Sequence, residues 1–187
     1  MNKDWFSEYF QRYKQPLFDK KVIQQLLDFK SLLINVNNNG GKVMAFGNGA
    51  SASISSHIST DLSKGAGIRT INFNDANLIT ALSNDYGYEH WMAKAVRIYG
   101  KKEDAIVLVS SSGSSRNVLK ASEIAKSMDM KVVTFSGFSS SNPLKKCGDI
   151  NFWVNSKAYN IIENMHMIWL TSVCDSIIGK AEYPVNI

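Results

Sequence analysis

The feature that most constrains the fold is a regular alternation of short apolar runs with longer segments of helical periodicity. The apolar runs lie at 43–46, about 68–73, 105–109, 131–135 and 150–154. The segments of helical periodicity lie at about 51–64, 76–83, 88–99, 115–128 and 159–178. Strands that alternate with helices predict βαβ units, which fold through right-handed crossovers into a parallel sheet. The sequence therefore predicts an α/β protein, a doubly wound parallel five-stranded sheet with helices on both faces.

A helical segment precedes the first apolar run. From about residue 5 to residue 36, apolar side chains recur at helical spacing, and the asparagine- and glycine-rich stretch 37–41 then stops the pattern. We expect one or two amphipathic helices here. A chain of 187 residues has room for one α/β domain but not for two ordinary ones. We expect a single domain over 1–187, with a helical extension at 1–40 and the α/β core at 41–187.

Charge and composition exclude several classes of function. The formal net charge is +5, but lysine and arginine are scattered and form no basic arm, so we do not expect nucleic acid as a partner. Cys147 and Cys174 show neither metal-binding nor redox spacing, which is typical of reduced thiols in a cytoplasmic protein. The start of the chain lacks the apolar core of a signal peptide. The apolar segment 161–178 is interrupted by charged and polar residues, so we expect no membrane span.

Two loops rich in small and hydroxyl residues follow apolar runs. The first, GNGAS at 47–51, follows the run 43–46, and the second, SSSGSS at 110–115, follows the run 105–109. Ligands of open parallel sheets bind beyond the carboxyl ends of the strands. Small residues let a ligand approach the backbone, helix N–H groups face it, and hydroxyls add donors. We expect both loops to bind the phosphate of a small molecule, with the loop 84–88 folding over the same edge.

Segment 47–52 also matches the loose dinucleotide fingerprint, glycine-x-glycine-x-x-alanine. A nicotinamide enzyme would normally need a further substrate domain, for which this chain has little room. Dinucleotide binding would also leave the second serine loop without a role. A serine loop that merely caps a helix is common, but two at corresponding places favour a phosphate site.

Two polar pairs stand at helical spacing. His57 and Asp61, four residues apart behind the first serine loop, share a helix face and could hold a metal, transfer a proton or form an ordinary surface pair. Glu163 and His166 lie in a strongly apolar segment, where a carboxylate needs a partner or a cavity. Glu163 is the site candidate of this pair, and His166 is typical of a core histidine.

Together these stretches resemble the sugar isomerase (SIS) domain family and, within it, the phosphoheptose isomerases. The matching stretches are 47–51 with His57 following, LSNDYGY at 82–88, 110–115 leading into NVLKA, and MKVVTFSG at 130–137. The resemblance covers nearly the whole chain and implies a flavodoxin-like fold. It implies interconversion of sedoheptulose 7-phosphate and D-glycero-D-manno-heptose 7-phosphate through an enediol, for the heptose of lipopolysaccharide. It also implies a homotetramer whose sites are completed by neighbouring subunits.

The resemblance also implies roles for individual positions. The substrate-binding positions would be Asn48, Gly49, Ser51, Asp85, Ser110, Ser111, Ser112 and Ser115. His57 falls on a metal ligand, often for zinc, and Asp61 falls where the family has a glutamate that is both ligand and base. Glu163 falls where a glutamine ligand is usual. Asp61 and Glu163 are the catalytic candidates, and with His57 they could form a three-ligand zinc site with an open position.

The chain departs from the family at two of these positions. Asp61 is one methylene shorter than glutamate, and Thr171 stands where the family has a histidine that is ligand and second acid–base group. Threonine cannot shuttle protons near neutral pH. The rival hypothesis is therefore a non-catalytic SIS protein that binds a phosphosugar as a regulator or associates with the bacterial replication initiator. Retention of His57 and Asp61 favours an isomerase with Asp61 as its base.

Overall fold

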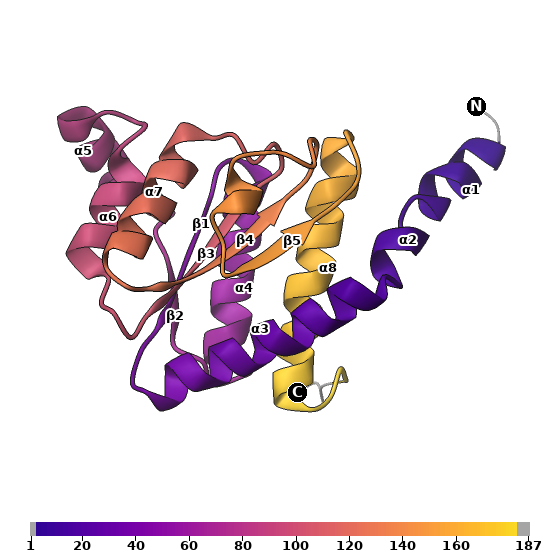
Figure 1. The fold of residues 1–187 in the computed structure, drawn as a ribbon, viewed down its shortest axis with the longest axis horizontal. Helices are drawn as coiled ribbons and strands as arrows, with labels where there is room; N and C mark the ends of the chain where they lie inside the picture. The colour runs from indigo at the N-terminus through magenta and orange to yellow at the C-terminus, as the bar shows by residue number, and fades with distance from the viewer. Residues whose placement is uncertain (1–2, 183–187) are drawn as a thin grey trace, which may run out of the picture.

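The computed structural model describes residues 3–182 as an open parallel sheet covered by helices on both faces (Figure 1). The five strands are β1 Val43–Gly47, β2 Thr70–Asn72, β3 Ala105–Ser110, β4 Lys131–Ser136 and β5 Ile150–Trp153. Their order across the sheet is β2-β1-β3-β4-β5, and each neighbouring pair is parallel. The doubly wound sheet predicted from the sequence is confirmed.

Each face of the sheet carries a layer of helices. The first face is covered by α3 Lys20–Asn38, α4 Ala50–Lys64 and α8 Tyr159–Ile178, and the second by α5 Ala76–Tyr86, α6 Trp91–Tyr99 and α7 Arg116–Ser127. Along β1, Val43 and Ala45 pack into the first layer, whereas Met44 and Phe46 pack into the second. Since both faces are buried, the strands read as continuous apolar runs rather than as alternating patterns.

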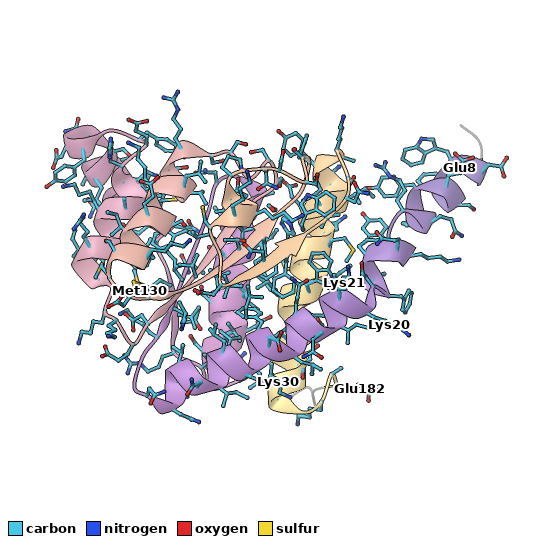
Figure 2. The ribbon with its side chains drawn as sticks, viewed as in Figure 1. Glu8, Lys20, Lys21, Lys30, Met130 and Glu182 are labelled. Carbon is cyan, nitrogen blue, oxygen red and sulfur yellow. The ribbon has the colours of Figure 1, made fainter. Side chains whose placement is uncertain are left out.

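The N-terminal extension consists of α1 Lys3–Gln11, α2 Lys14–Leu17 and α3. Asp19 begins α3 by accepting a hydrogen bond from the backbone N–H of Lys21 at 2.8 Å. Lys30, labelled on α3 in Figure 2, donates from Nζ to the Ser176 carbonyl of α8 at 2.7 Å. Helix α3 is thus fixed to the body, while α1 extends away from the sheet (Figure 1).

Helix α8 is apolar around most of its circumference because it contacts α3, α4 and β4. Its buried side chains include Ile162, Trp169 and Val173. Among residues 3–182, neither α8 nor another helix is long and apolar enough to cross a membrane.

Three elements differ in extent from those expected. Helix α5 continues to Tyr86, so residues 84–86 of the expected loop 84–88 are helical. Strand β2 pairs over 70–72 only, although Ile68 and Phe73 on either side of it are buried. An apolar run in the sequence indicates that its residues are buried, but a buried residue need not form the hydrogen bonds that pair a strand with its neighbour. Helix α6 begins at Trp91 rather than at 88, because Gly87 at φ 85° turns the chain between α5 and α6. A short 3₁₀ helix, η1 Leu144–Lys146, precedes β5.

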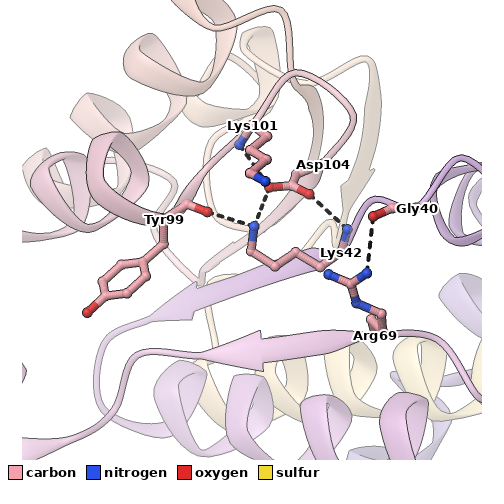
Figure 3. Close-up of polar contacts among 6 residues, drawn as sticks. All are labelled: Gly40, Lys42, Arg69, Tyr99, Lys101 and Asp104. Atoms are coloured by element: carbon pink, nitrogen blue, oxygen red, sulfur yellow. Dashed lines mark hydrogen bonds and ion pairs between the residues drawn. The ribbon is translucent and has the colours of Figure 1, made fainter.

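A buried ion pair holds β1 and β3 together where they begin (Figure 3). The Asp104 carboxylate accepts from the backbone N–H groups of Lys42 and Lys101, each at 2.8 Å, and pairs with the Lys42 ammonium. The same ammonium donates to the Tyr99 carbonyl at 2.6 Å. In the resulting register Val43 lies opposite Ala105, so β1 and β3 end side by side at the far edge of the sheet.

Candidate functional site

The two serine-rich loops meet at the carboxyl edge of the sheet. Gly47 lies opposite Val109 in the β1–β3 ladder, so the loop after each strand leaves the sheet beside the other. A crevice of about 170 Å³ opens between them. Its lining residues are Asn48, Ser51, Val109, Ser110, Ser111, Ser112, Ser115, Tyr159 and Glu163. The structure thus brings together six of the eight positions that the resemblance implied for substrate binding.

Local backbone geometry explains why the first loop is built of small residues. A Cβ atom at position 47 would overlap the backbone of Ser51, so the close turn from β1 into α4 requires glycine. Gly49 adopts φ 56°, which side chains rarely tolerate, and α4 begins directly after it. Helix α4 therefore starts at the crevice with its positive dipole end.

The second loop turns its hydroxyls inward. Within the described chain, the Ser115 side chain makes no capping bond to α7 although it holds the N-cap position. Its Oγ instead lies 3.1 Å from Oγ of Ser110. Ser112 Oγ accepts from the Ser114 backbone N–H at 3.2 Å. Ser110 is buried and Ser112 half-buried, so a cluster of neutral donors lines a small, partly enclosed space. Such a cluster suits a phosphate oxyanion.

Glu163 supplies a carboxylate to this crevice. It lies on the first turns of α8, half-buried, and its Oε1 accepts from the Ser111 hydroxyl at 3.2 Å. The sequence argument that a carboxylate in an apolar segment must face a partner or a cavity agrees with this position. His166, three residues on, is fully buried, and its Nε2 lies 3.1 Å from the Ser136 carbonyl. Burial lowers the pKa of His166 to about 4.

His57 and Asp61 pair as their spacing predicted, but away from the crevice. His57 Nε2 lies 3.0 Å from Asp61 Oδ2, with the two side chains 54% and 39% exposed. Asp61 stands ten residues after Ser51, which is about 15 Å along α4. It lines a second cavity of about 560 Å³ near the ends of α4 and α8, together with Cys174.

The expected three-ligand zinc site is not assembled within one chain. Across residues 3–182, no three histidine, cysteine or acidic side chains are grouped so that they could hold a metal ion. The physical reason is the placement of two helices. Glu163 lies level with Ser51, whereas Asp61 lies level with Cys174, further along the same helix pair. His57 and Asp61 offer two ligands, and Glu163 is engaged elsewhere.

The remaining predicted positions, Gly49, Asp85 and Thr171, do not line the crevice. Gly49 is exposed at the start of α4, and Asp85 is exposed near the end of α5, with Oδ1 accepting from the Asn84 amide at 3.0 Å. The Thr171 hydroxyl donates to the Met167 carbonyl at 2.9 Å within α8.

Sequence reasoning missed Tyr159, which lines the crevice from the first residue of α8. Its ring packs against Phe138 with centroids 4.9 Å apart and remains 58% exposed. A tyrosine that begins an apolar helix looks like another core residue. Tyr159 begins the helix that follows β5, and the start of a helix after a parallel strand is the position from which ligands are bound in such sheets. That position was the signal that could have identified it.

Comparison with known proteins agrees with this geometry. The family model described as SIS domain matches residues 8–137. A phosphoheptose isomerase of Helicobacter pylori (strain P12) is 34% identical over 187 residues, covering 95% of this chain and 96% of that protein. A phosphoheptose isomerase of Thermodesulfovibrio yellowstonii is 32% identical over 172 residues, covering 89% and 85%.

Solved structures give the same result. A phosphoheptose isomerase from Francisella tularensis superposes with a TM-score of 0.86 at 29% identity, covering 96% of this chain and 100% of that one. The phosphoheptose isomerase GmhA from Neisseria gonorrhoeae superposes with a TM-score of 0.84 at 27% identity, covering 93% and 95%. The resemblance seen in the motifs is thereby confirmed, and this chain belongs to the SIS domain family.

Proposed function

We propose that this protein is a phosphoheptose-type aldose–ketose isomerase that interconverts sedoheptulose 7-phosphate and D-glycero-D-manno-heptose 7-phosphate. The observation that carries the proposal is the crevice in which two serine loops meet a carboxylate, Glu163. We place the reaction in the cytoplasm, in the supply of heptose for lipopolysaccharide. Relatives named phosphoheptose isomerase support this reading along nearly the whole chain.

The crevice fits the phosphate end of such a substrate. The hydroxyls of Ser110, Ser112 and Ser115 and the start of α4 present donors and a positive dipole end to the anion. A space of about 170 Å³ is small for a whole sugar phosphate, since ligand pockets commonly hold about 300 Å³ or more. The sugar carbons therefore extend out of the crevice past Glu163.

Isomerisation needs a base at the carbons furthest from the phosphate. In the ketose-to-aldose direction the base removes a proton from C1, and the resulting enediol receives a proton at C2 while the O1 hydroxyl proton passes to the medium or to O2. C1 lies eight bonds from phosphorus, which at ~1.5 Å a bond is at most about 12 Å. Asp61 of the same chain, about 15 Å from Ser51 along α4, is out of reach.

This distance gives the oligomer a chemical role. We assign the base to Asp61, oriented by His57, acting on sugar held in the crevice of a neighbouring copy within a homotetramer. The exposed apolar side chains of the N-terminal helices support assembly: Trp5, Phe6, Phe10, Phe18, Ile23 and Leu27. Since residues 3–182 of one chain do not form a zinc site, zinc would need a further ligand from a neighbouring copy, and no step above depends on it.

Turnover by purified protein tests the function. We expect conversion of sedoheptulose 7-phosphate, followed by NMR with and without added zinc. Asp61→Ala should abolish conversion and leave sugar phosphate binding intact, whereas Asp28→Ala, an exposed carboxylate change on α3, should alter neither. Full activity of Asp61→Ala would refute the assigned base.

Mixing two inactive variants tests the shared site. Asp61→Ala retains a working crevice and Ser110→Ala retains a working base, so mixed oligomers should recover up to about a quarter of the activity if the site joins two copies. No recovery after subunit exchange would contradict sharing. Binding of the sugar phosphate without any conversion would instead favour the regulatory phosphosugar-binding protein, which the Thr171 position also allows.

A further inference from the structure

The side chain of Asn48, which lines the crevice, is held by two residues to which the sequence assigned no role. Asn48 and Asn117 form a reciprocal amide pair across the two loops: Asn48 Nδ2 donates to Asn117 Oδ1 at 3.0 Å, and Asn117 Nδ2 donates to Asn48 Oδ1 at 2.9 Å. The Tyr88 hydroxyl donates to the same Asn48 Oδ1 at 3.0 Å. Asn117 is 97% buried at the start of α7, and Tyr88 comes from the turn between α5 and α6.

A backbone group fixes the orientation of the whole network. The Val118 N–H can only donate, and it donates to Asn117 Oδ1 at 3.0 Å. The atom of Asn117 at that position must therefore be oxygen, and the Asn48 atom facing it must be nitrogen. Asn48 Oδ1 then necessarily faces Asn117 Nδ2 and the Tyr88 hydroxyl. Turning any one amide over would set oxygen against oxygen or N–H against N–H.

This orientation leaves one Asn48 group for a ligand. Both lone-pair positions of Asn48 Oδ1 are taken, and one of the two Nδ2 hydrogens is used on Asn117. No protein acceptor within residues 3–182 takes the second hydrogen, which in a reciprocal amide pair points away from the partner. Because Asn48 lines the crevice, the network offers an N–H donor and no free oxygen to an anion there.

We propose that Asn117 and Tyr88 are positioning residues that hold the Asn48 amide with its N–H toward the phosphate crevice. The inference rests on the proposed function only in taking phosphate as the ligand of that crevice. An unrestrained amide can turn its oxygen toward the crevice, which repels a phosphate dianion, so fixing the orientation removes one source of repulsion from a crevice that also holds the Glu163 carboxylate.

The Tyr88 bond also joins the third loop to the other two. Asp85, which the resemblance implies for sugar hydroxyls, lies three residues before Tyr88, in the last turn of α5. The hydroxyl of Tyr88 reaches from the turn after α5 to Asn48 of the first serine loop. The phenolic hydrogen bond therefore links the end of α5 and the turn after it to the first serine loop, and it occupies the second lone pair of Asn48 Oδ1.

Inorganic phosphate is the probe that tests this role, with its Kd measured by calorimetry. Tyr88→Phe removes the hydroxyl alone and should weaken phosphate binding about threefold to tenfold. Asn117→Leu replaces the amide with a branched apolar side chain and should weaken binding about tenfold or more. Tyr99→Phe is the matched control, because its hydroxyl belongs to the opposite edge of the sheet and should not alter binding (Figure 3). Unchanged Kd values for Tyr88→Phe and for folded Asn117→Leu would overturn the proposal.

A spectroscopic signature separates positioning from a general loss of structure. In ¹⁵N spectra of wild-type protein, the Asn48 side-chain NH₂ signals, assigned by their loss in Asn48→Asp, should shift when phosphate is added, and the shift should shrink in Tyr88→Phe. Asn48 side-chain signals whose chemical shifts do not change when phosphate binds would refute the inference without contradicting the proposed isomerase function. Wild-type protein that binds neither phosphate nor sedoheptulose 7-phosphate would overturn the inference and the proposed function together.

Discussion

Lowering the pH should destabilise the fold through one buried histidine. His166 is fully buried between α8 and the sheet, its Nε2 is bonded to the Ser136 carbonyl, and its Nδ1 has no partner within the described residues. Desolvation lowers its pKa from 6.5 to about 4, although the carbonyl bond acts in the opposite direction. The folded protein therefore keeps His166 neutral over a range in which the unfolded chain binds a proton there.

The sign and size of the effect follow from proton linkage. Above pH 6.5 the histidine is neutral in both states and makes no pH-dependent contribution. As the pH falls from 6.5 to 4, only the unfolded state takes up the proton, so the free energy of unfolding decreases by up to about 1.4 kcal/mol per pH unit. At pH 4.5 the loss from His166 amounts to about 2.5 kcal/mol.

Urea denaturation of wild-type protein and of His166→Leu at pH 7.5, 5.5 and 4.5 measures this contribution. All other ionisable groups are common to the two proteins, so the difference between their pH profiles isolates His166. Between pH 7.5 and 4.5, the free energy of unfolding of wild-type protein should fall by about 2.5 kcal/mol more than that of His166→Leu. His90→Leu, at a histidine whose side chain is 42% exposed, should show no comparable change. Parallel pH profiles for wild type and His166→Leu would refute the assignment.

Two further predictions concern other buried groups. Asp104→Ala leaves the Lys42 ammonium without its carboxylate where β1 and β3 begin, so it should lower the free energy of unfolding by about 3 kcal/mol in urea. Lys102→Ala, which removes an exposed ion pair, should have little effect on stability. Equal losses of unfolding free energy for the two variants would contradict a stabilising role of the buried Lys42–Asp104 pair. Burial, with Asp61 nearby, raises the pKa of the Cys174 thiol to about 11, so about one thiol in a thousand is ionised at pH 8. Cys174 should react with Ellman's reagent far more slowly in folded than in denatured protein, and equal rates would show that the thiol is accessible.

The sheet was predictable because its strands are buried on both faces. Val43 to Phe46 contribute side chains alternately to the two core layers, so a run of apolar residues marks the strand in the sequence itself. That the two serine loops meet was less directly encoded. It depends on β1 and β3 being neighbours although β2 lies between them in the chain. General knowledge of where such sheets bind ligands, rather than local spacing, predicted that meeting.

The arrangement of the carboxylates was not predictable from spacing. Positions 57 and 61 share a face of any helix, and they do pair in the structure. Whether Glu163 joins them depends on how far α8 is shifted along α4, which is fixed by packing between residues more than 100 positions apart. Asn117 was missed for a related reason. Within its own helix it looks like an ordinary first-turn residue, and its role arises from Asn48, 69 positions earlier.

The separation between the crevice and Asp61, the proposed base, bears on which sugar phosphates could react. If Ser110 and Ser112 hold the phosphate as proposed, the carbonyl of a three-carbon sugar would stay within the crevice that Glu163 also lines. In the proposed arrangement, a seven-carbon sugar would place its reacting carbons up to about 12 Å from phosphorus, out of the crevice and toward a neighbouring copy. If Asp61 is the base, the distance from the phosphate crevice to Asp61 of the neighbouring copy determines how long a reactive sugar phosphate must be. A sugar phosphate too short to leave the crevice then binds as an inhibitor, because its proton never meets the carboxylate that would remove it.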